Sequence, residues 1–194
     1  MKQDLQVPRR EILLEATIEY MLKHGVADLS LRPLAAKVGS KARLLIYHFG
    51  SKDALVSEAM IVVRDRVQRA FADMVENGRG HTPSQIIRAF WQWSTSKENE
   101  RYLRLFYEVQ GLALQKPNRY GQYLEGAVTT WVDMMATVLP ERMTWEKRRA
   151  LAALAVGAVV GLLIDYLSSG DKERSSLAVD IFAAGFDFLV LNEP

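Results

Sequence analysis

Apolar and polar residues follow one another along this chain with the period of an α-helix. In residues 9–24 the apolar side chains recur every three or four positions, and the same spacing returns in the later segments between glycine and proline residues. No stretch keeps the two-residue alternation that is typical of a half-buried strand. The pattern therefore predicts an all-α protein.

Helix-breaking and capping residues divide this pattern into about nine helices. Gly25 and Gly39 are placed to end two of them, and Pro140 to end another. Thr82-Pro83 has the N-cap and first-position residues of a new helix, and Ser30 is a further candidate N-cap. The expected helices cover residues 9–24, 30–38, 41–47, 53–75, 83–96, 100–114, 118–139, 144–167 and 172–191.

One segment, residues 150–164, contains fifteen residues without a polar side chain. A helix needs about 20 such residues to cross a bilayer. Arg148-Arg149 and Asp165 close the run at its two ends. We therefore expect a helix buried within the protein and no membrane span.

Two short predicted helices are joined by a tight turn at Gly39-Ser40. A pair of helices joined by a short turn with glycine is a helix-turn-helix, whose second helix fits the major groove of DNA. That second helix, residues 41–47, is short enough to enter a groove about 12 Å wide. We expect a DNA-binding domain at residues 1–52, and residues 53–194 to form a second helical domain.

Charge and composition agree with this division. Residues 1–52 contain nine Lys or Arg and five Asp or Glu, a net charge of +4, whereas the remaining residues contain 16 and 18. A basic segment on a mildly acidic body indicates a polyanionic partner for that segment. The chain has no cysteine, which excludes disulfides and thiolate metal sites. The first residues lack the apolar core of a signal peptide, so we expect a cytoplasmic protein.

Residues 9–56 resemble the TetR family of bacterial transcriptional regulators. The resemblance is carried by the helix-turn-helix and by the string His48-Phe49-x-Ser51-Lys52-Asp53-x-Leu55 after it. Ile46 stands where the family usually has Tyr, and Arg43-Leu44 replace a small Gly-Thr pair. The resemblance implies a three-helix DNA-binding head followed by a larger helical body that binds a small ligand and forms a homodimer.

Arg43 is the best candidate for reading a base, because its planar fork can grip O6 and N7 of guanine together. Leu44 or Ala42 can contact a thymine methyl group, and the other candidates are expected at phosphates, where they set the register. The predicted DNA-binding residues are Ser30, Arg32, Lys41, Ala42, Arg43, Leu44, Tyr47, His48 and Lys52.

Three of these residues have an alternative structural role. Tyr47 could lie partly in the core, and His48 could serve as a structural hydrogen-bonding residue. Arg32 could be a solvated surface charge with no ligand.

The body offers a surface for dimerisation, which a short recognition helix requires because it reads too few base pairs alone. Gly157 and Gly161 would let two helices approach closely, and Phe182 and Phe186 would supply apolar contact area. Packing within one chain is the alternative for these four residues.

Large aromatic and methionine side chains gather in the middle of the chain. Pockets for small organic molecules are mainly apolar with a few polar groups, so this composition favours a hydrophobic or aromatic effector. Packing in the core is the alternative for each residue. The predicted ligand-binding residues are Phe90, Trp91, Tyr102, Phe106, Gln110, Trp131, Met134 and Met135.

We therefore expect a ligand-responsive repressor that binds a palindromic double-stranded DNA operator as a homodimer, with no cofactor and no metal. A regulator controlled by a partner protein, and an activator, remain alternatives. A small helical enzyme is a further one, although the chain has no P-loop, no G-x-S-x-G and no G-x-G-x-x-G motif, and its three histidines form no metal-binding pair.

Overall fold

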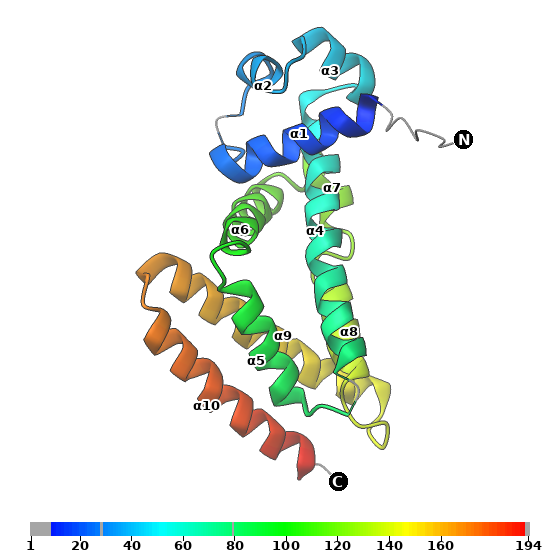
Figure 1. The fold of residues 1–194 in the computed structure, drawn as a ribbon. Coiled ribbons are helices and arrows are strands. Elements are labelled where there is room, and N and C mark those ends of the chain that lie inside the picture. Colours follow the sequence, from blue (N-terminus) through cyan, green and yellow to red (C-terminus); the bar gives the residue numbers. More distant parts are fainter. Residues whose placement is uncertain (1–8, 28, 79, 193–194) are drawn as a thin grey trace, which may run out of the picture. The chain divides into compact units, whose positions relative to one another are not determined.

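The computed structural model describes residues 9–27, 29–78 and 80–192, and these residues form helices joined by short turns, with no strand among them (Figure 1). The predicted all-α class is confirmed. The helices are α1 (Arg9–His24), α2 (Leu31–Lys37), α3 (Ala42–Phe49), α4 (Lys52–Asn77), α5 (Pro83–Ser94), α6 (Glu100–Gln115), α7 (Pro117–Leu124), α8 (Thr129–Thr137), α9 (Trp145–Ser169) and α10 (Lys172–Leu191).

Most helix ends lie where the sequence signals place them. Gly25 and Gly39 have φ of 72° and 64°, the left-handed conformation that ends a helix at little cost for glycine. Thr82 forms a complete capping box with Gln85 at the start of α5. Ser30 occupies the N-cap position of α2, but its side chain makes no capping hydrogen bond. The Ser30 hydroxyl therefore forms no hydrogen bond with the first amides of α2.

The structure has ten helices in its described part where about nine were predicted. The single helix expected at residues 118–139 is wrong, because the chain breaks between α7 and α8. Gly126, with φ of 70°, lies in this break, and a left-handed residue cannot continue a right-handed helix. Tyr120 adds a kink inside α7, with φ of −122°.

The chain folds into two compact units. The first comprises the residues up to Arg66 together with Arg101–Glu125, and the second comprises Val67–Glu100 together with the residues from Gly126 onward. Helices α6 and α7 therefore belong to the same unit as the helix-turn-helix, apart from the first residue of α6. The functional division at residue 52 stays a prediction.

The core of the first unit is formed by α1, α2, α3, α4, α6 and α7. Leu34 of α2, Leu45 of α3 and Leu55 of α4 have no exposed surface. Phe49 is buried at the end of α3, and the guanidinium carbon of Arg10 lies 4.7 Å from the centre of its ring. These contacts fix the orientation of α2 and α3 on the rest of the unit.

In the second unit, α10 packs against α5 and α9, and α9 packs against α8. The indole nitrogen of Trp91 on α5 donates a hydrogen bond to the Ser176 hydroxyl on α10 at 3.0 Å. Arg88 and Asp180 form an ion pair at 2.7 Å between the same two helices. Arg88 and Trp91 are three residues apart, so one side of α5 makes both of these contacts with α10.

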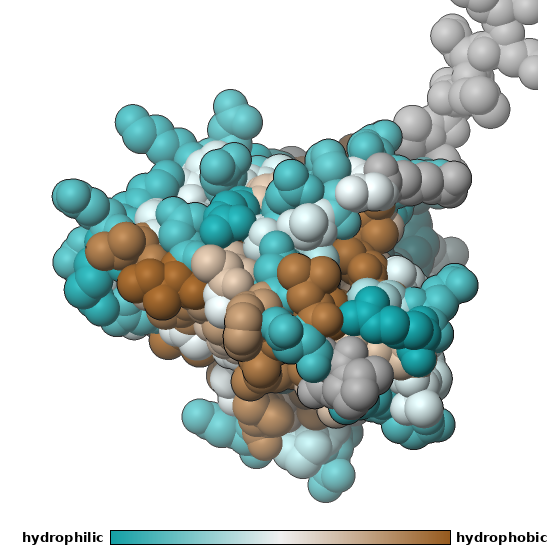
Figure 2. All heavy atoms as spheres, turned by 90° about the horizontal axis from the view of Figure 1, so that it is seen from below, coloured by the Kyte–Doolittle hydropathy of each residue, from teal (hydrophilic) through white to brown (hydrophobic). Residues whose placement is uncertain are grey.

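Helix α9 holds the long apolar run, and it is the one helix in the described residues that is long and apolar enough to cross a membrane. The expectation that it is buried within the chain is wrong, because only Ala152, Ala155, Val159 and Leu163 are buried. A single stripe of α9 contacts its neighbours, and the other side faces outward. Figure 2 shows apolar atoms, coloured brown, lying open on one face of the molecule.

Candidate nucleic-acid interface

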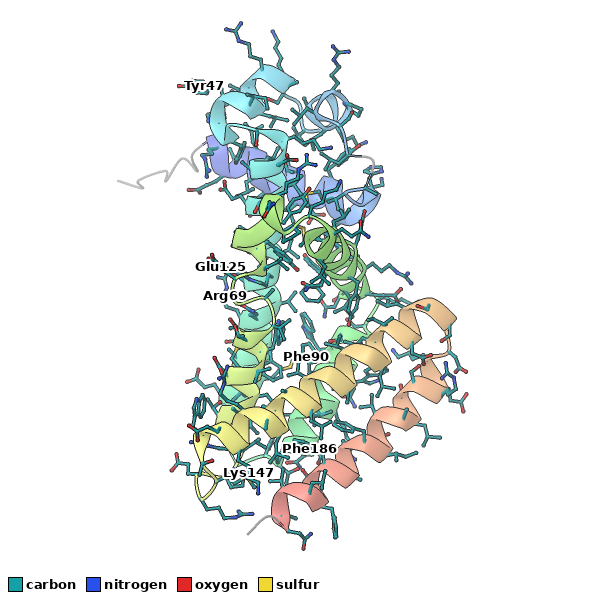
Figure 3. All side chains as sticks on the ribbon, turned by 180° about the vertical axis from the view of Figure 1, so that it is seen from behind. Tyr47, Arg69, Phe90, Glu125, Lys147 and Phe186 are labelled. Carbon is teal, nitrogen blue, oxygen red and sulfur yellow. The ribbon has the colours of Figure 1, made fainter. Side chains whose placement is uncertain are left out.

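The helix-turn-helix is held by its apolar side, which leaves its polar side exposed. Leu45 and Phe49 of α3 are buried, whereas Lys41, Arg43 and Tyr47 are exposed. Tyr47 is 80% exposed and points away from the ribbon (Figure 3). The alternative in which Tyr47 lies partly in the core is therefore wrong.

The exposed side of α3 borders a concave surface of about 550 Å³. Four of the predicted DNA-binding residues line it: Lys41, Arg43, Leu44 and Tyr47. Arg9, the first residue of α1, also lines this surface and was not among the predicted contacts. Its place next to Arg10 in a basic pair was the available signal.

Four cations of the helix-turn-helix lack ion-pair partners in the described part of the chain. Arg32, Lys37, Lys41 and Arg43 form no ion pair with any described residue. Elsewhere in the same unit, arginines are paired, for example Arg10 with Glu58. Because no carboxylate among the described residues pairs with these four cations, their charge is available to the phosphates of a polyanion.

Lys52 and His48 are partly used within the protein. The Lys52 ammonium donates a hydrogen bond to the carbonyl oxygen of Leu29, which ties the start of α4 to the segment before α2. The His48 ring lies between Tyr47 and Phe49, at 5.2 and 6.3 Å between ring centres. Ala42, half-buried, begins α3. Contacts of these residues with DNA remain predictions.

Comparison with known proteins finds a family model that matches the helix-turn-helix region. The model of bacterial regulatory proteins of the tetR family matches residues 13–59, which span α1 to the first part of α4. The HTH-type transcriptional regulator BetI 1 of Chromohalobacter salexigens is 27% identical over 165 residues, which cover 80% of this chain and 79% of the relative. BetI of Stenotrophomonas maltophilia is 25% identical over 118 residues, 60% of each chain.

Residues 13–59 thus match the DNA-binding region of the TetR family. Both of these relatives are named as HTH-type transcriptional regulators. Solved structures share the fold of this chain over almost its whole length. A transcriptional regulator from Rhodococcus sp. Rha1 has a TM-score of 0.75 at 21% identity and covers 94% of this chain and 96% of its own. The multidrug binding protein EbrR complexed with proflavin has a TM-score of 0.69 at 19% identity, with 89% and 96% covered.

The TetR fold places the four predicted dimer residues differently from one another. Gly157 and Gly161 are exposed on α9. Phe186 is only 1% exposed and packs inside the second unit, beside the half-buried Phe182 at 5.6 Å between ring centres. Phe186 is therefore unavailable for a dimer contact, and the exposed aromatic residue on α10 is Phe188, two positions later.

The predicted ligand-binding residues are divided between the two units. Tyr102, Phe106 and Gln110 are half-buried on α6 in the first unit, and the side-chain oxygen of Gln110 is buried without a hydrogen-bond partner among the described residues. Trp91 and Met135 in the second unit are at most 4% exposed and serve as core residues.

Four rings of the second unit form one aromatic cluster: Phe71 of α4, Phe90 and Trp93 of α5, and Trp131 of α8. Phe71 lies 5.3 Å from Phe90 and 5.5 Å from Trp131, and Phe90 stacks with Trp93 at 5.9 Å, all between ring centres. Figure 3 labels Phe90 within this unit. Phe71 was not predicted, because a single aromatic residue on a long amphipathic helix carries no distinctive signal.

Met134 lies outside this cluster. It lines an open hollow of about 790 Å³ between the ends of α4 and α8 and the start of α9, together with Asp133, His81 and Trp145. Asp133 is already paired with Arg149 at 2.7 Å.

Proposed function

We propose that the chain is a ligand-responsive repressor that binds a palindromic operator as a homodimer in the cytoplasm and is released by a small hydrophobic or aromatic effector. The observation that carries this proposal is the group of exposed cations on the helix-turn-helix that form no ion pair with a described residue. In this proposal residues 1–52 read DNA, and residues 53–194 bind the effector and the second subunit.

On DNA, Arg43 reads a base edge, because it is exposed on α3 and its guanidinium forms no ion pair with a described residue. Leu44 and Ala42 make apolar contacts beside it. Lys41, Tyr47 and His48 contact phosphates and set the register, with Ser30, Arg32 and Lys52 as flanking contacts. Arg9 joins them, since it borders the same concave surface.

Two such heads are needed, because the eight-residue α3 reads only a few base pairs. The outer sides of α9 and α10 provide a contact surface. Their exposed apolar residues recur every three or four positions, so that each helix presents one stripe. The stripes, which we call the α9–α10 apolar face, contain Leu154, Gly157, Gly161 and Ile164 on α9 and Leu177, Ile181 and Phe188 on α10.

The aromatic cluster of Phe71, Phe90, Trp93 and Trp131 supports an aromatic effector, since rings stack on rings and attract organic cations through their faces. EbrR, which shares the fold, is a multidrug binding protein whose structure was solved in complex with proflavin. We infer that the effector shifts the population of body conformations toward one that no longer fits the operator.

Selection of binding sequences from random duplex DNA tests this proposal first. A palindromic consensus with half-sites about 10 base pairs apart, or a multiple of that spacing, supports the dimeric regulator. No enrichment at low salt would overturn operator binding. Proflavin is then titrated into the protein–operator complex as the effector probe, followed by a panel of non-aromatic hydrophobic compounds. Dissociation by proflavin supports the aromatic site, and a complex that resists every compound favours control by a partner protein.

A further inference from the structure

Glu108, in the middle of α6, holds the backbone of the turn that leads into the helix-turn-helix. One oxygen of its carboxylate accepts two hydrogen bonds, from the amide of Val26 at 2.8 Å and from the amide of Ala27 at 2.7 Å. These amides follow the last turn of α1, so they have no partner inside a helix. A carboxylate that accepts two amides is a strong, charge-assisted contact.

Gly25 makes room for this contact. A Cβ atom built at Gly25 would lie 2.7 Å from the other carboxylate oxygen of Glu108, which is closer than any real contact. The φ of 72° at the same residue disfavours other side chains independently. The chain thus carries at Gly25 the residue that both bends the backbone and lets the carboxylate approach.

The rest of α6 is fastened to α1 along the same side. Leu105, Val109 and Ala113 are buried in the core that also contains Ile18 and Met21 of α1. The guanidinium of Arg101 pairs with Glu19 of α1 at 3.2 Å. Helices α1 and α6 therefore share one core and an ion pair, and Glu108 adds the contact to the turn beyond α1.

A second stripe of α6 carries the predicted effector-binding residues. Tyr102, Phe106 and Gln110 are spaced by four, and they lie one residue, or about 100° around the helix, from the stripe that packs on α1. An effector bound against this second stripe would displace α6, and Glu108 with it.

We propose that Glu108 is a positioning residue for DNA binding: its carboxylate fixes the turn between α1 and α2 onto α6, so that a displacement of α6 reaches α2 and α3. This inference rests on the proposed function, because it assumes that the chain selects an operator. Glu108 itself contacts no DNA.

Two variants and one matched control test the inference in the full-length chain. Glu108→Ala removes the acceptor, and Glu108→Gln keeps an oxygen that can accept both amides. Glu19→Gln is the control, since it removes an ion pair between α1 and α6 but leaves the turn intact. Affinity for the selected operator is measured at several salt concentrations, well below the melting temperature of each variant, and amide hydrogen exchange is measured at Val26 and Ala27.

Glu108→Ala is expected to lose about tenfold in operator affinity, the size of a charge-assisted hydrogen-bond contribution. The slope of log affinity against log salt stays unchanged, because no phosphate contact is lost. Exchange at Val26 and Ala27 accelerates. Glu108→Gln recovers most of the affinity, and Glu19→Gln stays within about twofold of the wild-type chain, as a surface ion pair contributes little.

Unchanged affinity in a folded Glu108→Ala variant would overturn the inference, as would a Glu108→Gln variant that binds no better than Glu108→Ala. Wild-type protein that selects no DNA would instead overturn the proposed function. In that case the hydrogen-exchange measurement without DNA still tests the contact between Glu108 and the two amides. If the contact exists, Val26 and Ala27 must exchange faster in Glu108→Ala than in the wild-type chain.

Discussion

Replacing Ile181 with alanine tests whether the α9–α10 apolar face joins two subunits. Ile181 is 67% exposed in the single chain. The substitution removes three carbon groups, and burial of each contributes about 0.8 kcal/mol. About two thirds of the resulting 2.4 kcal/mol, or roughly 1.6 kcal/mol of dimerisation free energy, is therefore lost in each subunit. A twofold interface uses the same patch twice, which gives about 3 kcal/mol per dimer and a dissociation constant raised roughly 200-fold.

Folding of the single chain should be little affected, because alanine favours helices and Ile181 contributes mostly exposed surface. The dimer dissociation constant is measured by sedimentation velocity over a dilution series. Ile12→Ala is the matched control: Ile12 is 55% exposed, but it lies on α1 in the first unit. Equal dissociation constants for Ile181→Ala and Ile12→Ala would refute the assignment of this face, and a monomeric wild-type chain would refute dimerisation altogether.

Three further predictions concern DNA, the effector and acid. Arg43→Ala should lose about 1–3 kcal/mol of binding free energy at one base pair of the operator only. Lys41→Ala should weaken binding to all DNA sequences alike and lower the slope of log affinity against log salt by about one. Binding to a panel of operator variants distinguishes the two outcomes. Trp131→Leu should weaken proflavin binding about tenfold in a fluorescence titration, with operator affinity retained, and unchanged binding would make the aromatic cluster purely structural. Hydrogen bonds from Arg174, then from Ser175, lower the pKa of Asp165 below its ordinary 3.8. The charged form is thus favoured in the folded chain, so this stabilisation is present above pH 3.8 and is lost as the pH falls through the lower folded value. Melting curves of Asp165→Asn should therefore depend less on pH in acid than those of the wild-type chain, and parallel curves would contradict this.

Lys41 is chosen over Lys52 to test the phosphate contacts for a structural reason. Lys52 was an equal candidate in the sequence, but its ammonium donates to the carbonyl oxygen of Leu29. Removing it would disturb the position of α2 as well as any phosphate contact. Lys41 is exposed and forms no ion pair with a described residue, so its removal changes the charge of the face alone.

Local patterns determined the helices, their ends and the helix-turn-helix. The capping box at Thr82 and the left-handed Gly25 involve residues within a few positions of one another, so the chain encodes them wherever the helix packs. The buried side of α3, with Leu45 and Phe49, follows from the helical period for the same reason. Which side of α3 is buried and which is exposed, with Arg43 on the exposed side, was therefore largely predictable.

Only the tertiary structure decided which side of each apolar helix is covered. Helices α9 and α10 carry apolar residues on several sides, so periodicity could not distinguish the buried Phe186 from the exposed Phe188. The contact of Glu108 with the amide of Val26 joins residues 82 positions apart, and no local pattern specifies such a pairing. A sequence fixes the direction in which a side chain leaves its own helix, whereas the neighbour that it meets depends on how all the helices pack.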